Sequence, residues 1–451
     1  MQANARLMIL LLLSVSLFAF TGCSDDDDPV APVPAGTTFT VTIENVSPTY
    51  DYFGSGAFDT PVGAGGPGPI LPGGAYEVRF GAAPGDKLSF ATMMVQSNDL
   101  FFAPAGSGIE LYAGTTPVSG DVTGQVMLWD AGTEANEEPG LGANQAPRQG
   151  GADTGPADGD TTVRLVDDGF TYPAVSDMIE ATLTSHGNGE FTLRLENVST
   201  AATLVPSSGP SLPVPMAPGV FAVHSADNPL FVAGAPNPGE GLEALAEDGS
   251  AGGLATALAG RTGLASPLAP GVFAVHGSGT PVFTAGAADA GHGLEDVAED
   301  GSAGALAAYL ENLAGLSAAG SFAVPVGGAG PGPLLPGSSY RFTVEGRSGD
   351  RLSFATMFVQ SNDLFFGPAD TGLALFDANG MPVTGDITAQ VMLWDAGTEA
   401  NQWPGVGPDQ APRQSGPDTG ASDPNPTVRT PSDGYVYPAV AAVVRVTVAT
   451  E

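Results

Sequence analysis

Two short acidic segments carry the residues of this chain best suited to bind a cation, and both segments occur twice. QSND ends at Asp99, and WDAGTE places Asp130 and Glu134 four residues apart with Gly132 between them. Glycine permits the tight turn that would let both carboxylates face one point. Because Ca²⁺ binds about six to eight oxygen atoms, two such loops together could hold one ion. The second copy repeats the three acids as Asp363, Asp395 and Glu399.

These acids also have a purely structural explanation. Aspartate in a turn commonly accepts hydrogen bonds from nearby backbone N–H groups, and a single Asp-Gly loop would favour that role. Two loops that keep their acids in both copies, while neighbouring residues differ, favour cation binding instead. The residues by themselves leave both explanations open.

The chain shows no motif of a known catalytic site. It lacks Gly-x-Ser-x-Gly, His-Glu-x-x-His and a phosphate-binding glycine loop, and Cys23 is its only cysteine. His224 and His276 end the repeated segment FAVH, and we expect them at the surface, at strand ends, with a zinc-binding pair as the alternative. Paired acids hydrolyse glycosides only in a cleft that raises one pKa, and the sequence shows no cleft. We therefore expect a protein that is not an enzyme, with a hydrolase of unrecognised type as an alternative.

Charge argues against one class of partner. The chain has 49 Asp and Glu residues but only 13 Lys and Arg residues, which gives a formal net charge of −36. Such a field repels phosphate backbones, so we expect no nucleic-acid partner. Hydrophobic residues make up 42% of the chain and allow a packed core, while 64 Gly and 40 Pro favour short strands joined by turns. The acidic balance is typical of proteins in saline surroundings and also of acidic secreted proteins.

The first residues predict export and a lipid anchor. Leu7–Phe20 is an apolar run of signal-peptide length, too short for a good membrane-spanning helix, so residues 1–22 are predicted to be a signal peptide. Cys23, preceded by Gly22, resembles the lipidated cysteine of the bacterial lipoprotein lipobox, although a plain secretory signal beside a chance cysteine is the alternative. Residues 23–36, with four consecutive Asp, are predicted to be an acidic tether. We expect an exported protein, anchored through Cys23 to the bacterial cell envelope at the outer membrane or the cell surface.

Internal repeats define the predicted domain organisation. LSFATMMVQSNDLFFAP returns later in the chain as LSFATMFVQSNDLFFGP. FTVTIENVS, which begins at Phe39, matches FTLRLENVS, which begins at Phe191. We therefore predict a first domain over residues 37–187 and a second over residues 188–451. The second is expected to carry a duplicated insert at about 212–318, in which each unit is a short strand followed by one or two short helices.

Residue alternation predicts that both copies are built from β-strands. In FTVTIENV, Phe39, Val41 and Ile43 share one face, and Thr40 and Thr42 share the other. Other candidate strands are rich in β-branched and aromatic residues and are separated by Gly, Pro and Asp turns, without a strand–helix–strand rhythm. The predicted fold class is all-β, with two tandem antiparallel β-sandwiches, the second carrying the helical insert.

FATMMVQSNDLFFAP followed by LWDAGTEAN resembles the spondin N-terminal domain family, in which a Met-rich strand precedes a Ser-x-Asp-aromatic loop and a Trp-Asp-Ala-Gly-Thr-acid loop follows. GLEDVAEDGSAGALAAYLEN resembles the helical segment of that family. The resemblance implies a β-sandwich that binds Ca²⁺ through Asp99, Asp130 and Glu134 and through their second-copy equivalents. Many members have Asp where this chain has Glu134. Animal members are extracellular matrix and adhesion proteins.

These features support one main hypothesis about function. We expect a non-catalytic, surface-anchored binding or adhesion protein, in which Ca²⁺ orders the loops that meet an extracellular protein, glycan or lipid. The alternative is a structural envelope lipoprotein, in which acidic sandwiches act as salt-tolerant spacers and Ca²⁺ only stabilises them.

Overall fold

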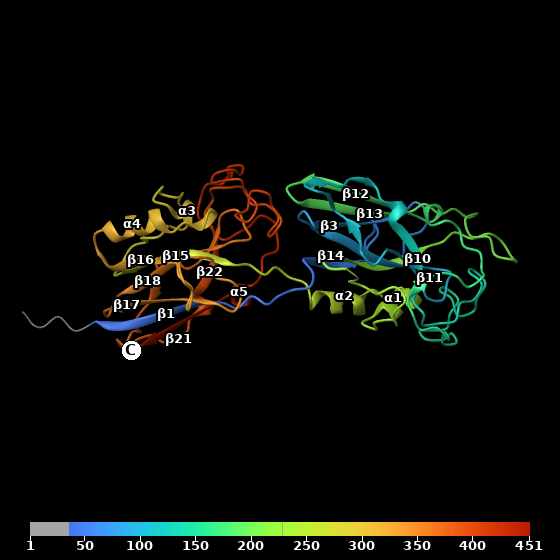
Figure 1. The fold of residues 1–451 in the computed structure, drawn as a ribbon, viewed down its shortest axis with the longest axis horizontal. Helices are drawn as coiled ribbons and strands as arrows, with labels where there is room; N and C mark the ends of the chain where they lie inside the picture. Colours follow the sequence, from blue (N-terminus) through green and yellow to red (C-terminus); the bar gives the residue numbers. More distant parts are fainter. Residues whose placement is uncertain (1–35, 228) are drawn as a thin grey trace, which may run out of the picture. The chain divides into compact units, whose positions relative to one another are not determined.

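The computed structural model describes residues 36–227 and 229–451, and these residues form the all-β, sandwich-type fold predicted from the sequence (Figure 1). Every pair of adjacent named strands is antiparallel. The predicted signal peptide, Cys23 and the tether up to residue 35 lie outside the described residues. Among the helices in the described part of the chain, none has the length and hydropathy needed to cross a membrane.

Two sheets enclose a first hydrophobic core, and we call them sheet pair A. The larger sheet has the order β11-β10-β5-β4-β14-β2 with β6 beside β4, and the smaller has the order β3-β13-β12-β9. The core between them contains Phe90, Phe102 and Phe191. The strand bounds are β2 Gly54–Phe58, β3 Ala75–Gly81, β4 Lys87–Met94, β5 Leu100–Pro104, β6 Ile109–Glu110, β9 Gly120–Asp121, β10 Val126–Asp130, β11 Arg164–Leu165, β12 Ile179–Gly187, β13 Glu190–Asn197 and β14 Met216–His224, with a separate ribbon of β7 Tyr112–Ala113 and β8 Thr116–Pro117.

Two further sheets enclose a second core, and we call them sheet pair B. One has the order β17-β1-β23-β21, and the other has the order β16-β15-β18-β19-β22 with β20 beside β18. The core between them contains Phe39, Phe354 and Phe366. The strand bounds are β1 Thr37–Asn45, β15 Leu268–His276, β16 Leu316–Phe322, β17 Ser339–Gly346, β18 Arg351–Phe358, β19 Leu364–Pro368, β20 Leu373–Ala374, β21 Gly385–Asp386, β22 Val391–Asp395 and β23 Val444–Thr450.

Short helices cover the outer face of the larger sheet in each pair. In sheet pair A, Leu245 and Leu258 pack against Phe101 and Trp129, so this face of the sheet is buried as well. In sheet pair B, Leu310 and Trp394 belong to the equivalent cluster. The helix bounds are α1 Leu242–Asp248, α2 Gly252–Ala259, α3 Leu294–Glu299, α4 Gly304–Asn312 and α5 Val440–Val443, with 3₁₀ turns at Thr123–Gln125, Val175–Asp177 and Thr388–Gln390.

Strand pairing differs from the predicted domain boundaries. The first strand, β1, lies between β17 and β23 of sheet pair B, where its blue ribbon runs beside orange and red strands (Figure 1). The matching segment β13 pairs with β12 and β3 of sheet pair A. The predicted boundary between residues 187 and 188 therefore falls inside the β12–β13 hairpin. The tight turn around Asn188 explains this pairing, because a short turn makes consecutive strands neighbours.

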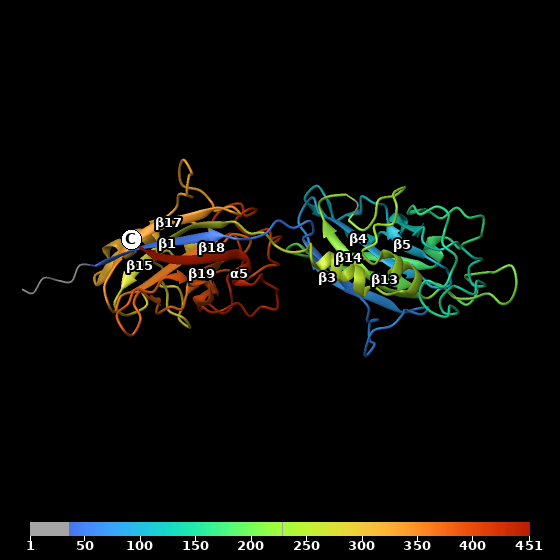
Figure 2. The same ribbon diagram turned by 90° about the horizontal axis from the view of Figure 1, so that it is seen from below.

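The duplicated insert is also divided between the two sheet pairs. Its first unit begins with β14, which pairs with β4, and its second unit begins with β15, which pairs with β18; Figure 2 shows β14 beside β4. The insert was predicted to lie entirely in the second sandwich. Each sheet pair instead contains one strand–helix unit, because each unit supplies a strand that its larger sheet needs.

Candidate functional site

Neighbouring strand ends bring two of the predicted acids together in each sheet pair. Asp99 directly precedes β5, and Asp130 is the last residue of β10, where it lies opposite Leu100 of β5. Both acids are almost fully buried, with Asp99 0% and Asp130 1% exposed. Asp363 and Asp395 occupy the same positions at β19 and β22 and are each 0% exposed.

The buried Asp99 side chain accepts hydrogen bonds from the WDAGTE loop. Its Oδ2 atom accepts hydrogen bonds from the Thr133 backbone N–H at 2.8 Å, the Thr133 hydroxyl at 3.0 Å and the Glu134 backbone N–H at 3.1 Å. Its Oδ1 atom is buried and has no hydrogen-bond partner among the described protein groups. Asp363 makes the same three contacts and also leaves Oδ1 without a partner.

Asp130 closes the turn and pairs with an arginine that the sequence analysis did not single out. Its Oδ1 accepts the Gly132 N–H at 2.7 Å, and Gly132 has the positive φ of 70° that favours glycine. Its Oδ2 accepts bonds from the Asn136 side chain at 2.8 Å and from Arg164 at 2.7 Å. The tripeptide TVR occurs at residues 162–164 and again at 427–429. Because arginine is rare in so acidic a chain, this repeat was the sequence feature that could have identified Arg164.

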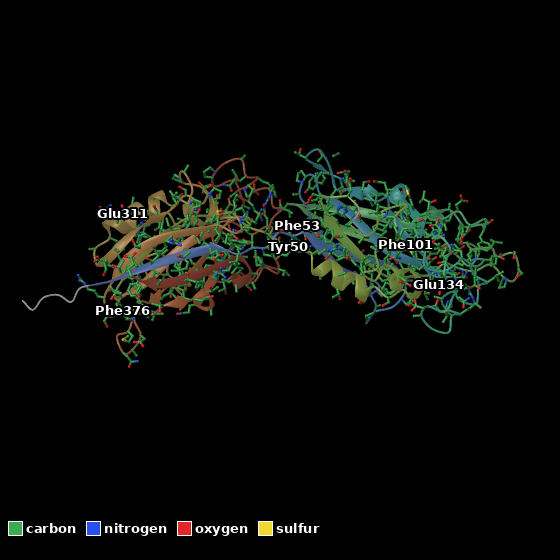
Figure 3. The ribbon with its side chains drawn as sticks, turned by 60° about the horizontal axis from the view of Figure 1, so that its bottom comes forward. Tyr50, Phe53, Phe101, Glu134, Glu311 and Phe376 are labelled. Carbon is green, nitrogen blue, oxygen red and sulfur yellow. The ribbon has the colours of Figure 1, made fainter. Side chains whose placement is uncertain are left out.

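Glu134 contributes its backbone to this network but directs its carboxylate elsewhere. One carboxylate oxygen accepts a bond from the Asn98 side chain at 3.2 Å, and the other accepts the Gly155 N–H at 2.5 Å. Glu399 makes the equivalent contacts with Asn362 and Gly420. Glu134, labelled in Figure 3, lies near the start of the irregular segment between β10 and β11. The structure thus brings Asp99 and Asp130 together and places the Glu134 carboxylate on a separate set of donors.

Burial and like charges raise the pKa of the central acids. Burial, followed by the charge of Asp99, raises the pKa of Asp130 to about 7, and the opposing effect of Arg164 is smaller. Burial likewise raises the pKa of Asp99, Asp363 and Asp395. Each of these acids therefore takes up a proton more readily in the fold than in the unfolded chain.

These shifts predict that stability falls as the pH rises. An acid with a raised folded pKa contributes stability that is present below its unfolded value, 3.8 for Asp130, and that is lost as the pH rises through about 7. In chelator, the melting temperature should drop by several degrees between about pH 5 and pH 8. Calorimetric scans at fixed ionic strength measure this change.

Repulsion among the many surface carboxylates also lowers stability as the pH rises, so the prediction needs a matched control. Asp99→Asn with Asp363→Asn should flatten the pH dependence more than Glu180→Gln with Glu345→Gln, which removes the same charge from exposed positions. Equal slopes for the two variants would show that the buried acids do not cause the effect.

A second set of acids lies close together in each sheet pair. Within the described residues, potential ligand atoms lie within 4.8 Å of one another in two groups, and the predicted trios are not among these groups. Four of these residues lie in the duplicated insert, for which the sequence predicted strands and short helices but no ligands. The two groups are Asp153, Glu243 and Glu247 in sheet pair A, and Glu295, Glu299 and Asp418 in sheet pair B.

The two repeated histidines are buried, contrary to the expectation that they lie at the surface. His224 is 1% exposed and its Nε2 lies 2.9 Å from the Ser89 hydroxyl, and His276 makes the same contact with Ser353. Burial lowers the pKa of both rings, which favours the neutral form. Each Ser–His pair sits inside its sheet pair, where it joins neighbouring strands.

Comparison with known proteins adds no relative to this description. No family model matches the chain, and no curated protein matches it. The resemblance to spondin N-terminal domains stays a prediction from the motifs.

Proposed function

We propose that this chain is a non-catalytic, surface-anchored binding or adhesion protein, with loops ordered by Ca²⁺. The observation that carries the proposal is the buried acid network built in the same way in both sheet pairs. Each network anchors a long irregular segment, residues 131–163 in sheet pair A and 396–428 in sheet pair B. Long loops held on a rigid scaffold are commonly the parts of a protein that bind partners.

One oxygen of the buried acid network in each sheet pair is free to bind a hard cation. Asp99 Oδ1 and Asp363 Oδ1 are buried oxygens without a donor, and a buried carboxylate is stabilised by a positive charge. The oxygens of Asp130 and Glu134 already accept N–H groups, but each has a further lone pair. Ca²⁺ would be held by Asp99 and Asp130 in sheet pair A and by Asp363 and Asp395 in sheet pair B. Glu134 and Glu399 would complete these sets only after their carboxylates turn away from Asn98 and Gly155 and from Asn362 and Gly420. The ion would supply charge neutralisation and loop order, which the resemblance to spondin domains also suggests.

Calorimetric titration tests the metal part of this proposal. The segment Gly36–Glu451 contains both sheet pairs and the core of each, so it holds the contacts that its own folding needs. Titration with CaCl₂ should release heat and raise the melting temperature, and Asp99→Asn with Asp363→Asn should remove the heat from these sites. The exposed-acid control, Glu180→Gln with Glu345→Gln, should bind as wild type does. Unchanged heat in the Asp99 and Asp363 variant would refute these ligands.

Binding to cell surfaces tests the adhesion part. Fluorescently labelled Gly36–Glu451 should attach to intact bacterial or host cells in Ca²⁺ and detach in chelator. Pretreating the cells with protease, glycosidase or detergent then distinguishes protein, glycan and lipid partners. A chelator that lowers the melting temperature but leaves attachment unchanged, or a complete lack of attachment, would favour the alternative role of a salt-tolerant structural spacer.

A further inference from the structure

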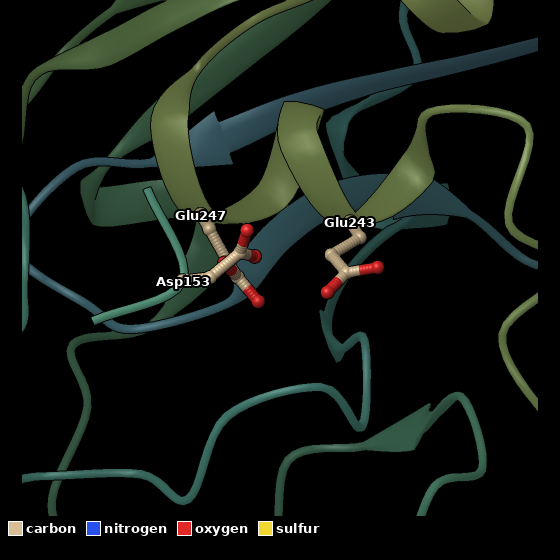
Figure 4. Close-up of side chains that lie close together, drawn as sticks. All are labelled: Asp153, Glu243 and Glu247. Carbon is tan, nitrogen blue, oxygen red and sulfur yellow. The ribbon is translucent and has the colours of Figure 1, made fainter. Parts of the chain in front are cut away.

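A cluster of three carboxylates lies on the helical side of each sheet pair. In sheet pair A, Glu243 and Glu247 lie one turn apart on helix α1, and Asp153 reaches them from the irregular loop of residues 131–163 (Figure 4). Ligand oxygens of all three lie within 4.8 Å of one another. The cluster therefore joins two segments that are far apart in the sequence.

The same cluster is built a second time in sheet pair B. Glu295 and Glu299 lie one turn apart on helix α3, and Asp418 reaches them from residues 396–428. The residues between the glutamates differ, since α1 reads LEALAED and α3 begins LEDVAE. Asp153 and Asp418 also share a left-handed backbone, with φ of 51° and 52°. Both units therefore keep all three acids, although two of the three residues between the glutamates differ.

One carboxylate in each cluster is buried without the partners that it needs. Glu247 is 2% exposed and neither of its carboxylate oxygens has a hydrogen-bond partner among the described protein groups. Glu299 is 1% exposed, and its Oε2 also lacks a partner, while its Oε1 accepts the Asp418 N–H at 2.6 Å. Burial strips a charged group of its water, so a bare carboxylate at this position would destabilise the fold.

No protein cation compensates these acids in the described part of the chain. The ion pairs found there include none with a member of either cluster. Burial and, after it, the nearby charge of Glu134 raise the pKa of Glu247 to about 7. The surroundings of Glu247 therefore disfavour a carboxylate that has no positive charge beside it. A proton would neutralise only one carboxylate, whereas a bound cation would occupy the open oxygens and offset the charge of all three acids.

We propose that each cluster binds one Ca²⁺ ion, with Glu247 or Glu299 as the buried ligand and the other two carboxylates at the rim. Three carboxylates without His or Cys suit a hard cation and disfavour zinc. Asp153 and Glu243 are exposed, so water can complete the coordination shell. In sheet pair B, Glu295 also lines a surface pocket together with Gly397 and Thr398. These ions would fasten each irregular loop to the helix of its strand–helix unit.

This site uses none of the acids assigned to Ca²⁺ above and does not depend on the proposed function. Its main test is the variant Glu247→Gln with Glu299→Gln in the segment Gly36–Glu451. Titration with CaCl₂ should show the loss of one ion for each cluster, or a weakening of about tenfold or more, because a charged ligand is removed. Without Ca²⁺, this variant should melt at or above the wild-type temperature, since an unpaired buried charge is gone; with Ca²⁺, it should gain less than wild type.

A second variant keeps the test decisive if the buried substitution prevents folding. Asp153→Asn with Asp418→Asn changes only exposed positions, and asparagine tolerates the left-handed backbone there. It should weaken Ca²⁺ binding at the same sites. Asp99→Asn with Asp363→Asn should leave the ions of these clusters bound, so failure of one site can be told apart from failure of the other. Wild-type stoichiometry and affinity in both cluster variants would overturn the proposal.

Discussion

Deletion of Thr37–Asn45 is expected to unfold sheet pair B and to leave sheet pair A folded. β1 is a central strand, bonded to β17 on one side and to β23 on the other, and it buries Phe39, Val41 and Ile43 at 0% exposure. Each of these side chains contributes about 1.5–3 kcal/mol on burial, so their combined loss rivals the whole stability of a typical domain, about 5–15 kcal/mol. Both sheets of sheet pair A form without any residue of β1.

Hydrogen exchange measured by mass spectrometry checks this expectation on the chain that begins at Val46. Amides of β17, β18 and β23 should lose protection, while amides of β3, β12 and β13 should keep it. Substituting the outward-facing residues with Thr40→Ala and Thr42→Ala provides the control and should cost less than about 1 kcal/mol. Loss of protection in β3 and β13 instead would mean that β1 belongs to sheet pair A, as the sequence analysis predicted.

Replacing Arg164 with Met is expected to destabilise the fold by about 2–3 kcal/mol, because it leaves a buried carboxylate unpaired. Arg164 lies directly opposite Asp130 across β10 and β11 and contacts both Asp130 at 2.7 Å and Asp158 at 2.6 Å. Asp130 is 1% exposed, so water cannot replace the lost guanidinium. Arg429 pairs with Asp395 at 2.9 Å in sheet pair B, and its replacement should have a similar effect.

Urea unfolding followed by circular dichroism measures the cost. Arg445→Met is the matched control, since its partner Glu44 is accessible to water, and the expected cost is below about 1 kcal/mol. The double substitution Arg164→Met with Asp130→Asn should recover much of the lost stability, because the fully buried position then carries no unpaired charge, whereas Asp158 keeps some contact with water. If Arg164→Met behaves like Arg445→Met, the buried ion pair does not support the loop.

Local features of the site were predictable because they depend on residues close in sequence. Alternating apolar residues indicated the strand that carries Phe39, and the burial of alternate residues along β1 follows that pattern. The turn at Gly132 has the positive φ that its glycine permits. Asp99 and Asp130 lie close together because Asp99 precedes β5, Asp130 ends β10, and these two strands are neighbours. The sequence predicted that the two loops lie at the same end of the sandwich.

Other contacts of the site depend on parts of the chain that only packing brings together. Arg164 lies 34 residues from Asp130, and nothing in the loop sequence identifies it as the partner. Glu243 and Glu247 lie in the insert for which the sequence predicted helices, but neither was identified as a ligand. Asp153 comes from an irregular loop, whose path follows no periodic pattern. The burial of His224 likewise depends on the neighbouring strand that carries Ser89.

The sequence by itself determined the all-β class, the repeated units and the acids that both copies keep, because these follow from residue type and periodicity. Only the tertiary structure decided which copy of each repeated strand joins which sheet. FTVTIENV and FTLRLENV have nearly the same strand preference and the same apolar face, so either could fill either place. The short turn at Asn188 binds the second copy to β12, and the first copy, β1, completes the distant sheet of sheet pair B.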